Sequence, residues 1–346
     1  MFSHREGVSN LTLGSALDCY ASWPSPVAIL SDGAYGINGF EGDPDTEAEL
    51  VDWYEPHVRA WSDQVTSQTT LWFWNTEVGW ATVHPLLISH GWVYNQLVVW
   101  DKGIGHIANN VNSKTIRSLP VVTEVCARYT RPMVFLSGDT ETDLQTWIRS
   151  EWDRTGLSRR EANTACGVKE AATRKYFGTD RQWYAPPPEV FEKLSDYANT
   201  HGIPEGRPYF DLGDDFKQAR SESTLQRESK WGKIRAKWNH QHGLTNVWTS
   251  PAVRGSERIN FEGAGFHPNQ KPLSLMERQI QLSTDEGDVI WEPFGGLCTA
   301  SFAAARLGRD SYAAEITKSV YDVASARLGR PSDLTYGPSV LDLFGI

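Results

Sequence analysis

The feature that most constrains the fold is a strand–turn–helix–strand pattern near the C-terminus. The apolar run Asp288–Trp291 predicts a buried strand, which ends in Glu292-Pro293-Phe294-Gly295-Gly296-Leu297-Cys298-Thr299. The Ala-rich stretch Ala300–Leu307 predicts a helix, and Ser311–Ala314 predicts a second strand that ends at Glu315. This order is typical of one half of a doubly wound α/β sheet, in which ligands bind at the carboxyl ends of the strands.

The turn between strand and helix has the composition of a ligand site. Gly295 and Gly296 let the backbone approach a ligand closely, and the start of the following helix offers unpaired N–H groups to an anion. Glu315, at the end of the second strand, is placed to accept hydrogen bonds from a ribose. The turn lacks the G-x-G-x-x-G pattern of dinucleotide folds. Taken alone, the Gly-Gly pair also fits a plain tight turn.

Two motifs in this region resemble a known family. His267–Pro272 followed by Glu292–Thr299 resembles motif X followed by motif I (D-P-F-x-G-x-G-T) of the amino-group DNA methyltransferases, in the order of their circularly permuted β class. The resemblance covers roughly 11–135 and 245–328 and implies a site for S-adenosylmethionine. The cofactor-binding residues that it implies are Lys271, Glu292, Phe294, Gly295, Gly296, Thr299 and Glu315. Glu292 replaces the usual Asp, and Cys298 replaces the third Gly.

A catalytic motif is implied near the N-terminus. Val27–Ser31 predicts a buried strand that delivers Asp32-Gly33-Ala34-Tyr35-Gly36, in the place of motif IV, D-P-P-Y-G. The resemblance implies that the Asp32 carboxylate and the Gly33 carbonyl accept hydrogen bonds from the target amino group, and that Tyr35 stacks on the flipped base. Both prolines of the family motif are absent, so we expect a less rigid loop. The alternative is a plain strand-ending turn.

Strands and helices alternate along the rest of the first third. Apolar runs at 11–14, 71–74, 92–100, 121–127 and 133–136 predict strands, and 52–61 and 80–89 predict helices. With the resemblance, this favours a Rossmann-like, seven-stranded, mostly parallel methyltransferase sheet. Trp100–Gly103 resembles a strand-end loop near the target base. Thr123–Val125 resembles a later family motif in which the Glu, here Glu124, is structural.

The parallel-sheet pattern lapses in the middle of the chain. We therefore predict a target-recognition insertion, largely helical, over 138–262, between catalytic segments 1–137 and 263–346. Within it, 159–166, Gly167-Val168 and 169–177 have the pattern of a helix-turn-helix. That pattern places Lys169, Arg174 and Lys175 on a groove-facing helix. The alternative is a small helical subdomain whose charges are simply solvated.

Composition limits the class of partner and the compartment. The net charge of −10 argues against unspecific polyanion binding, so DNA would dock on the basic middle third. The four cysteines are scattered, which argues against disulfides and a metal site. No apolar run approaches the roughly 20 residues of a membrane span, and residues 1–10 have no signal-peptide core. We expect a cytoplasmic protein without membrane contact.

The expected function is site-specific methylation of duplex DNA, with methyl transfer from S-adenosylmethionine to an exocyclic amino group. Adenine N6 is favoured because an acid at the Asp32 position is more usual in adenine enzymes. A cytosine-N4 methyltransferase and a catalytically degenerate DNA-binding protein of the same fold are the alternatives. The resemblance also leaves room for a homodimer and for a cognate restriction endonuclease.

Overall fold

A computed structural model describes residues 5–40, 42–106, 117–137, 139–179, 183–204, 206–212, 232–254, 257–261, 264–265 and 269–329. The chain divides into two units. The first, here called the sheet unit, comprises Met1–Arg131 and Ala236–Ile346, and the second, the helical unit, comprises Pro132–Arg235. No helix in the described stretches is long and apolar enough to cross a membrane.

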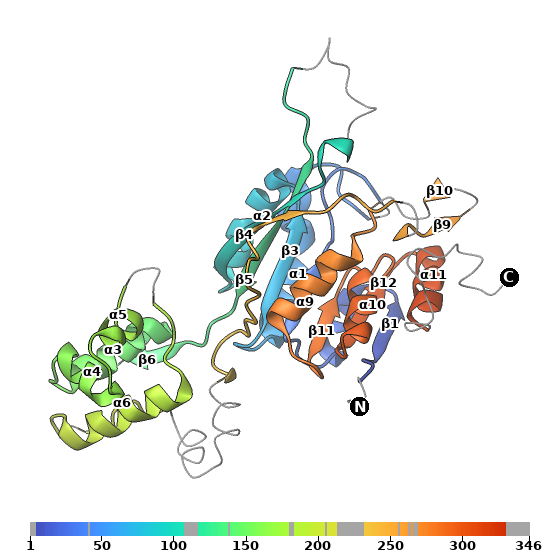
Figure 1. The fold of residues 1–346 in the computed structure, drawn as a ribbon. Helices are drawn as coiled ribbons and strands as arrows, with labels where there is room; N and C mark the ends of the chain where they lie inside the picture. Colours follow the sequence, from blue (N-terminus) through green and yellow to red (C-terminus); the bar gives the residue numbers. More distant parts are fainter. Residues whose placement is uncertain are drawn as a thin grey trace. The chain divides into compact units, whose positions relative to one another are not determined.

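The sheet unit is built on one eight-stranded sheet (Figure 1). In spatial order its strands are β1 (Ser9–Leu13), β12 (Asp310–Glu315), β11 (Val289–Glu292), β2 (Ala28–Ser31), β3 (Thr70–Asn75), β5 (Thr123–Thr130), β4 (Val93–Asp101) and β8 (Val247–Thr249). β5 is antiparallel to both neighbours, and the other pairs are parallel. The mostly parallel α/β sheet is confirmed. It has one strand more than expected, because β8 pairs with β4.

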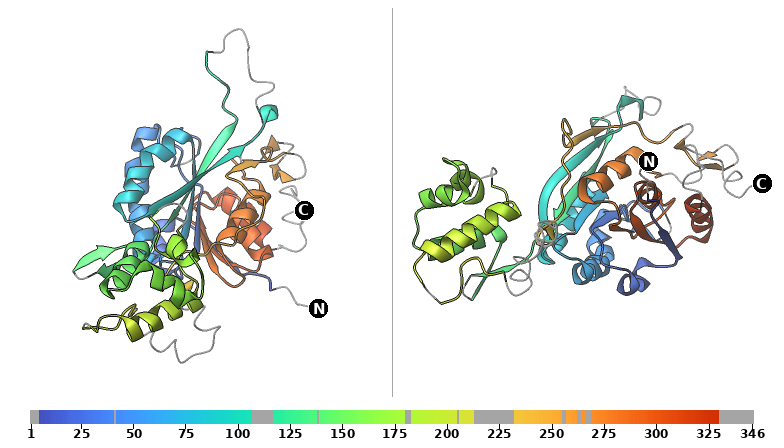
Figure 2. Two further views of the ribbon diagram at one scale, coloured as in Figure 1. Left: turned by 60° about the vertical axis from the view of Figure 1, so that its left-hand side comes forward. Right: turned by 60° about the horizontal axis from the view of Figure 1, so that its bottom comes forward.

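Helices cover both faces of the sheet (Figure 2). The longer helices of this unit are α1 (Leu50–Gln64), α2 (Glu77–Ser89), α9 (Leu273–Ser283), α10 (Thr299–Arg306) and α11 (Lys318–Leu328), and its 3-10 turns are Ala16–Asp18, Tyr20–Ser22, Glu47–Glu49 and Ile104–His106. Ile29 and Phe73 pack with α1 and α2, whereas Leu30 and Trp72 pack with α9 and α10. Because successive side chains of a strand point to opposite faces, a strand covered on both sides reads as a continuous apolar run.

The strand order creates a crevice at the centre of the sheet. β11 and β2 are parallel neighbours, with Trp291 opposite Ile29, so their carboxyl ends meet at one edge. After β11 the chain continues to β12, on one side of this pair, and after β2 it continues to β3, on the other side. Ligands of open α/β sheets bind at such a switch point. The topology therefore brings Asp32, after β2, close to the glycine turn after β11.

The helical unit has its own apolar core. Its elements are β6 (Phe135–Ser137), β7 (Thr140–Thr142), α3 (Leu144–Arg154), α4 (Arg159–Cys166), α5 (Ala171–Tyr176) and α6 (Pro188–His201). Trp147, Trp152 and Phe191 pack at its centre. The buried Glu151 carboxylate accepts hydrogen bonds from Arg154, Arg207 and the Phe210 backbone N–H, which ties α3 to the chain after α6. An independent core of this kind is what defines a domain.

The organisation of the chain differs from the sequence-based expectation in three respects. The run 133–136 was expected to form a strand of the main sheet. Instead, β6 pairs with β7 in a separate two-stranded ribbon, and β5 lies between β3 and β4 and pairs with both. The helical unit ends at Arg235, whereas the predicted insertion extended to 262. Within that stretch β8 belongs to the main sheet, and β9 (Asn260–Phe261) pairs with β10 (Ala264–Gly265).

Candidate active site

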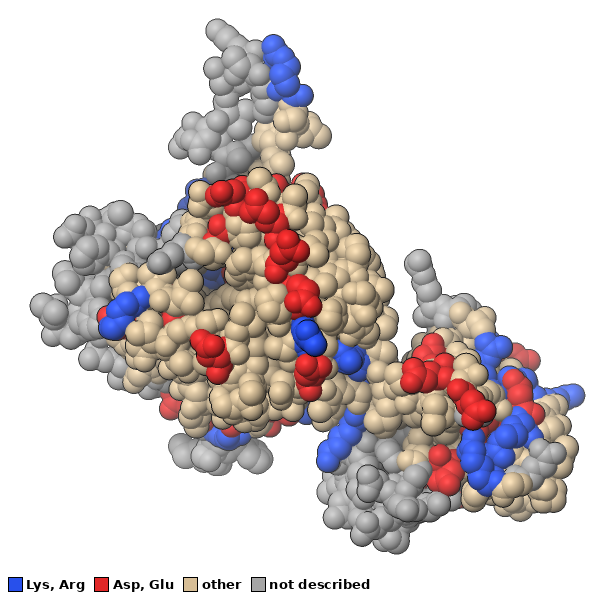
Figure 3. Space-filling view, turned by 180° about the vertical axis from the view of Figure 1, so that it is seen from behind, with Lys and Arg blue, Asp and Glu red and all other residues tan. Residues whose placement is uncertain are grey.

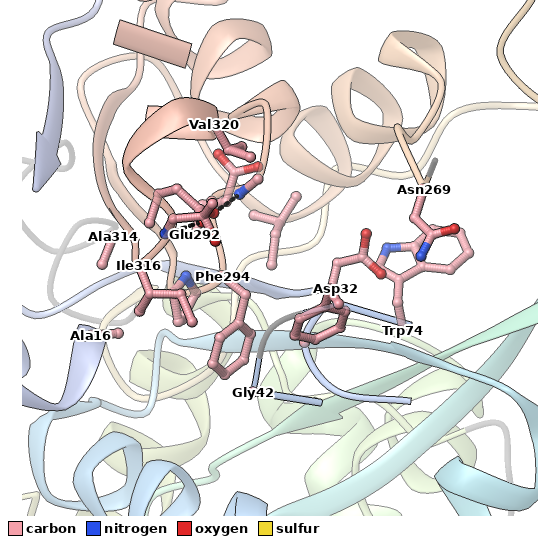
Figure 4. Close-up of a pocket in the computed structure, with 18 of the residues that line it drawn as sticks. Ala16, Asp32, Gly42, Trp74, Asn269, Glu292, Phe294, Ala314, Ile316 and Val320 are labelled. Atoms are coloured by element: carbon pink, nitrogen blue, oxygen red, sulfur yellow. Dashed lines mark hydrogen bonds between the residues drawn. The ribbon is translucent and has the colours of Figure 1, made fainter. Parts of the chain in front are cut away.

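A cavity of about 620 Å³ opens at the carboxyl ends of β2 and β11. It is lined by all of the residues predicted for catalysis and cofactor binding: Asp32, Gly33, Tyr35, Lys271, Glu292, Phe294, Gly295, Gly296, Thr299 and Glu315. In Figure 4, Asp32 lies on the side of Trp74 and Asn269, Glu292 and Ile316 lie on the other side, and Phe294 lies between them. His267 and Pro268 of the predicted lead-in lie outside the described residues.

Two carboxylates accept hydrogen bonds from backbone N–H groups in and around the glycine turn. Glu292 accepts hydrogen bonds from the N–H groups of Ala300 (3.0 Å) and Ser301 (2.7 Å) at the start of α10. Glu315 accepts from Gly296 N and Thr317 N, each at 2.8 Å. The N–H groups of Ala300 and Ser301, which were expected to be open to an anion, are therefore already bonded. The turn suits a ligand that carries no phosphate.

Burial shifts the protonation of both carboxyl groups. It raises the pKa of Glu292 to about 7, against the opposing effect of the hydrogen bonds from Ser301 and Ala300. Burial also raises the pKa of Glu315 above its ordinary value. A cationic ligand in the cavity would favour the ionised forms of these groups. The acidic lining therefore fits a ligand with positive charge.

Cys298 takes the conformation that the replaced glycine would adopt. Its φ of 52° is left-handed, and its side chain is buried against Ala313 and Ala324. A non-glycine residue in this region is uncommon and carries a modest backbone cost, which the apolar contacts of the thiol offset. Cys298 thus adopts the left-handed backbone conformation that glycine favours.

Asp32 is held in a cluster of charged and hydrogen-bonding groups. Its Oδ1 accepts hydrogen bonds from Lys271 Nζ (2.7 Å) and from Tyr35 OH (2.8 Å). Lys271 Nζ also donates to Tyr35 OH (3.0 Å) and lies 3.3 Å from Glu124 Oε2. Burial alone would lower the pKa of Lys271, but Asp32 and Glu124 outweigh it and raise that pKa. Lys271 is therefore a cation, and it contacts the predicted catalytic motif directly.

Tyr35 is less accessible than the stacking role requires. Its side chain is 8% exposed, and its ring centre lies 5.3 Å from the Lys271 ammonium. Burial, together with the nearby Asp32, raises the pKa of its hydroxyl well above the ordinary value, so it remains a hydrogen-bond donor. In this arrangement the ring on which the base is expected to stack is buried and lies beside the Lys271 ammonium.

Hydrogen bonds replace the missing prolines of the catalytic loop. The buried Asp43 carboxylate accepts from the N–H groups of Tyr35 (2.9 Å), Gly36 (2.9 Å), Ile37 (3.2 Å) and Gly39 (2.9 Å). The Ala34 carbonyl accepts from Asn75 Nδ2 (2.8 Å) and Tyr54 OH (3.0 Å). The expected loss of rigidity is thus countered by side chains outside the motif.

Gly33 is required by close packing. A Cβ at this position would lie 2.6 Å from Phe294 Cδ2 and 2.8 Å from the Tyr54 hydroxyl. Phe294 is in turn wedged between the rings of Trp53 and His57, at 5.1 and 4.9 Å. Burial lowers the pKa of His57 to about 4, so this aromatic wall is neutral.

We expect Gly33→Ala to destabilise the fold by about 1–3 kcal/mol, because the added methyl group overpacks the site and Phe294 is held in place by Trp53 and His57. Gly33→Pro, which restores the family residue, should cost at least as much. Urea unfolding measures both. Gly105→Ala, at a site where a Cβ meets no atom within 4 Å, is the control. Equal stability of Gly33→Ala and the wild type would disprove the packing argument.

The predicted DNA-binding residues are exposed on the helical unit. α4 ends at Gly167, whose φ is 68°, and α5 starts at Ala171, so Lys169 lies in the turn and not on the second helix. Arg174 and Lys175 lie in the last turn of α5. The helix is six residues long, shorter than the 169–177 predicted. Figure 3 shows Lys and Arg side chains gathered on part of this unit, and a row of acidic side chains on the face of the sheet unit that carries α1 and α2.

Some residues of the site escaped the sequence analysis. Asp43, Tyr54 and Asn75 belong to no recognised motif. Their role depends on hydrogen bonds to the backbone of the catalytic loop, which the sequence pattern does not reveal. Glu124 and Lys102 were noticed only as parts of loosely matching motifs, yet they form an ion pair at 2.9 Å beside Lys271. Their positions at the ends of adjacent strands, β5 and β4, were the available signal.

The fold and this cavity define an α/β protein that binds its ligand at the switch point of a doubly wound sheet. Comparison with known proteins identifies the family. The model of the DNA methylase family matches residues 27–326, and the chain belongs to that family. This confirms the resemblance found in the sequence.

Two curated relatives match part of the chain. The type II methyltransferase M.HindIII of Haemophilus influenzae is 33% identical over 40% of this chain and 48% of its own length. M2.LlaDCHI of Lactococcus lactis subsp. cremoris is 35% identical over 30% of this chain and 37% of its own length. The chain thus spans less than half the length of each.

A solved structure shares the fold. The PvuII DNA methyltransferase, described as cytosine-N4-specific, is 12% identical, covers 100% of this chain and 94% of its own, and has a TM-score of 0.53. At this identity the likeness concerns the fold alone.

Proposed function

We propose that the protein transfers a methyl group from S-adenosylmethionine to the exocyclic amino group of a base in duplex DNA, with adenine N6 favoured. One observation carries this proposal: the Asp32 carboxylate and the glycine turn after β11 line the same cavity. An acceptor for the amino group and a place for the methyl donor therefore share one space, as an in-line transfer requires.

The residues of the turn fit S-adenosylmethionine. This cofactor carries a sulfonium, an ammonium and a carboxylate group but no phosphate. That agrees with a turn in which Gly296 N donates to Glu315, and with a helix start at which Ala300 N and Ser301 N donate to Glu292. The cavity walls supply carboxylates for the cationic groups and the aromatic rings of Phe294 and Trp53 for the adenine. When bound, the cofactor supplies an activated methyl group.

Asp32 supports the proposed chemistry on the base side. The lone pair of an aromatic amino group is delocalised into the ring, which makes the nitrogen a poor nucleophile. A carboxylate that accepts a hydrogen bond from the amino group shifts electron density back to the nitrogen and can take the proton that is released. Gly33 lines the cavity beside Asp32, and its carbonyl would serve as the second acceptor.

Two alternatives make different predictions. A cytosine-N4 methyltransferase would use the same groups on a different base. A degenerate DNA-binding protein would follow from a collapsed catalytic loop, but the Asp43 hydrogen bonds, which hold the loop without prolines, favour activity.

Transfer of a labelled methyl group from S-adenosylmethionine to unmethylated duplex DNA tests the proposal, with single-stranded RNA as the control substrate. We expect label in DNA only. Calorimetric binding of the cofactor without transfer to any DNA would support the degenerate protein, and label in RNA alone would support an RNA methyltransferase.

We further propose that the helical unit recognises the target sequence, in a cytoplasmic protein that meets DNA directly. Its separate core and its basic exposed residues support this assignment. A homodimer and a cognate restriction endonuclease, for which the resemblance in the sequence leaves room, belong to the same proposal.

Replacing Arg174 and Lys175 together with Ala should weaken duplex binding, because both side chains are exposed on α5 and suited to phosphate contacts. We expect the slope of log affinity against log salt to fall by about 1–2. Fluorescence anisotropy at several salt concentrations measures it. Lys193→Ala, an exposed change on α6, is the control. An unchanged slope would remove α5 from the DNA interface.

A further inference from the structure

The Lys271 ammonium lies where the proposed reaction needs the target amine. Its Nζ donates to Asp32 Oδ1 at 2.7 Å and to Tyr35 OH at 3.0 Å, and it faces the Tyr35 ring. Asp32 and Tyr35 are the two groups proposed to hold and stack the incoming base. While the ammonium stays in this place, the base amino group must therefore share the Asp32 carboxylate with it.

A second acceptor is available to Lys271 nearby. Glu124 Oε2 lies 3.3 Å from Nζ, is buried, and makes no aligned hydrogen bond with any described residue. Its other oxygen, Oε1, accepts from Lys102 Nζ at 2.9 Å, which fixes the carboxylate in place. A buried carboxylate oxygen without a hydrogen bond is costly. A small movement of Nζ towards Glu124 would satisfy it.

We propose that Lys271 is a two-position residue, which holds Asp32 and Tyr35 while no base is present and withdraws to Glu124 when the target base enters. This rests on the proposed function. Lys271 is then a positioning residue: it keeps the catalytic loop aligned before the base arrives and releases the Asp32 carboxylate to the amino group.

The surroundings allow this movement at low cost. Asp32, Lys271, Glu124 and Lys102 alternate in sign, so the shift leaves the ammonium paired with a carboxylate throughout. The buried Trp74 ring lies 5.4 Å from Nζ and adds a cation–π contact. This role differs from the resemblance, which assigned Lys271 to the cofactor and made Glu124 structural.

Glu124→Gln tests the second position, because the amide keeps the shape of the side chain but removes the charge that receives Lys271. We expect the KM for unmethylated genomic DNA to rise about tenfold, because the variant loses one charge-assisted hydrogen bond to Lys271. The kcat and the cofactor dissociation constant should stay within about twofold, since a seated base meets the same Asp32. Glu77→Gln, an exposed change at the start of α2, is the control and should leave all three values unchanged.

A second test follows Lys271 itself in the wild-type protein. The ¹⁵N-ammonium NMR signal of Lys271, assigned by its loss in Lys271→Arg, should stay in place with a non-reactive cofactor analogue and shift when duplex DNA is added. An unshifted signal, or a Glu124→Gln enzyme with the KM of the wild type, would overturn the two-position proposal. Absence of methyl transfer by the wild type, measured first, would instead defeat the proposed function on which it rests.

Discussion

Asp32→Ala should lower the rate of methyl transfer by about 10²–10⁴-fold, the range expected for loss of a positioned acid–base group. The carboxylate is the group at the base end of the cavity that can accept from the amino group and take its proton. Cofactor affinity should stay close to that of the wild type, because the glycine turn is fixed by Glu292 and Glu315 and not by Asp32. Rates of methyl transfer and calorimetric titration measure the two effects separately.

Loss of Asp32 also leaves the buried Lys271 with one carboxylate partner, Glu124, so a stability control is needed. Asp32→Asn keeps the shape and should lose nearly as much activity, while urea unfolding reports the cost to the fold. Asp63→Ala, on the exposed face of α1, is the matched surface change. Wild-type activity in Asp32→Asn would show that the carboxylate is not the catalytic acceptor.

Asp43→Ala should lower the free energy of unfolding by about 3 kcal/mol or more, because four backbone N–H groups lose a charged acceptor in a buried site. Methyl transfer should also fall, by about 10²-fold, since a displacement of Asp32 and Tyr35 by about 1 Å is enough for such a loss. Urea unfolding and transfer rates at a temperature where the variant remains folded test both parts.

Asp43→Asn sharpens this test. Its amide oxygen can accept two of the four N–H groups, but its NH₂ group then faces the other two donors, so we expect a clear loss here as well. Asp45→Ala, two residues away and exposed, should resemble the wild type. If Asp43→Asn were as stable and active as the wild type, the loop would not depend on this carboxylate.

The central sheet and the ends of its strands could be predicted from the sequence because their signals are local. The strands before Asp32 and Glu292 are short apolar runs, and their periodicity does not depend on distant residues. The parallel pairing of these strands then brings their carboxyl ends together by topology alone. Neither step requires knowledge of side-chain contacts.

The contacts that hold the site could not be predicted in this way. Lys271 and Asp32 are 239 residues apart in the sequence. The motif resemblance alone predicted that Lys271 binds the cofactor. Asp43 acts through backbone N–H groups that become donors only once the loop has folded. Similarly, α5 starts at Ala171, two residues later than its sequence suggested, which leaves Lys169 in the turn before it.

The most direct test of the central claim is incubation with S-adenosylmethionine and unmethylated genomic DNA, followed by digestion to nucleosides and mass spectrometry. We predict a new N6-methyladenine signal that is absent with Asp32→Ala. A signal of N4-methylcytosine would keep the enzyme but change its target base. Absence of both, from a folded protein that binds the cofactor, would contradict the assignment of this cavity to methyl transfer.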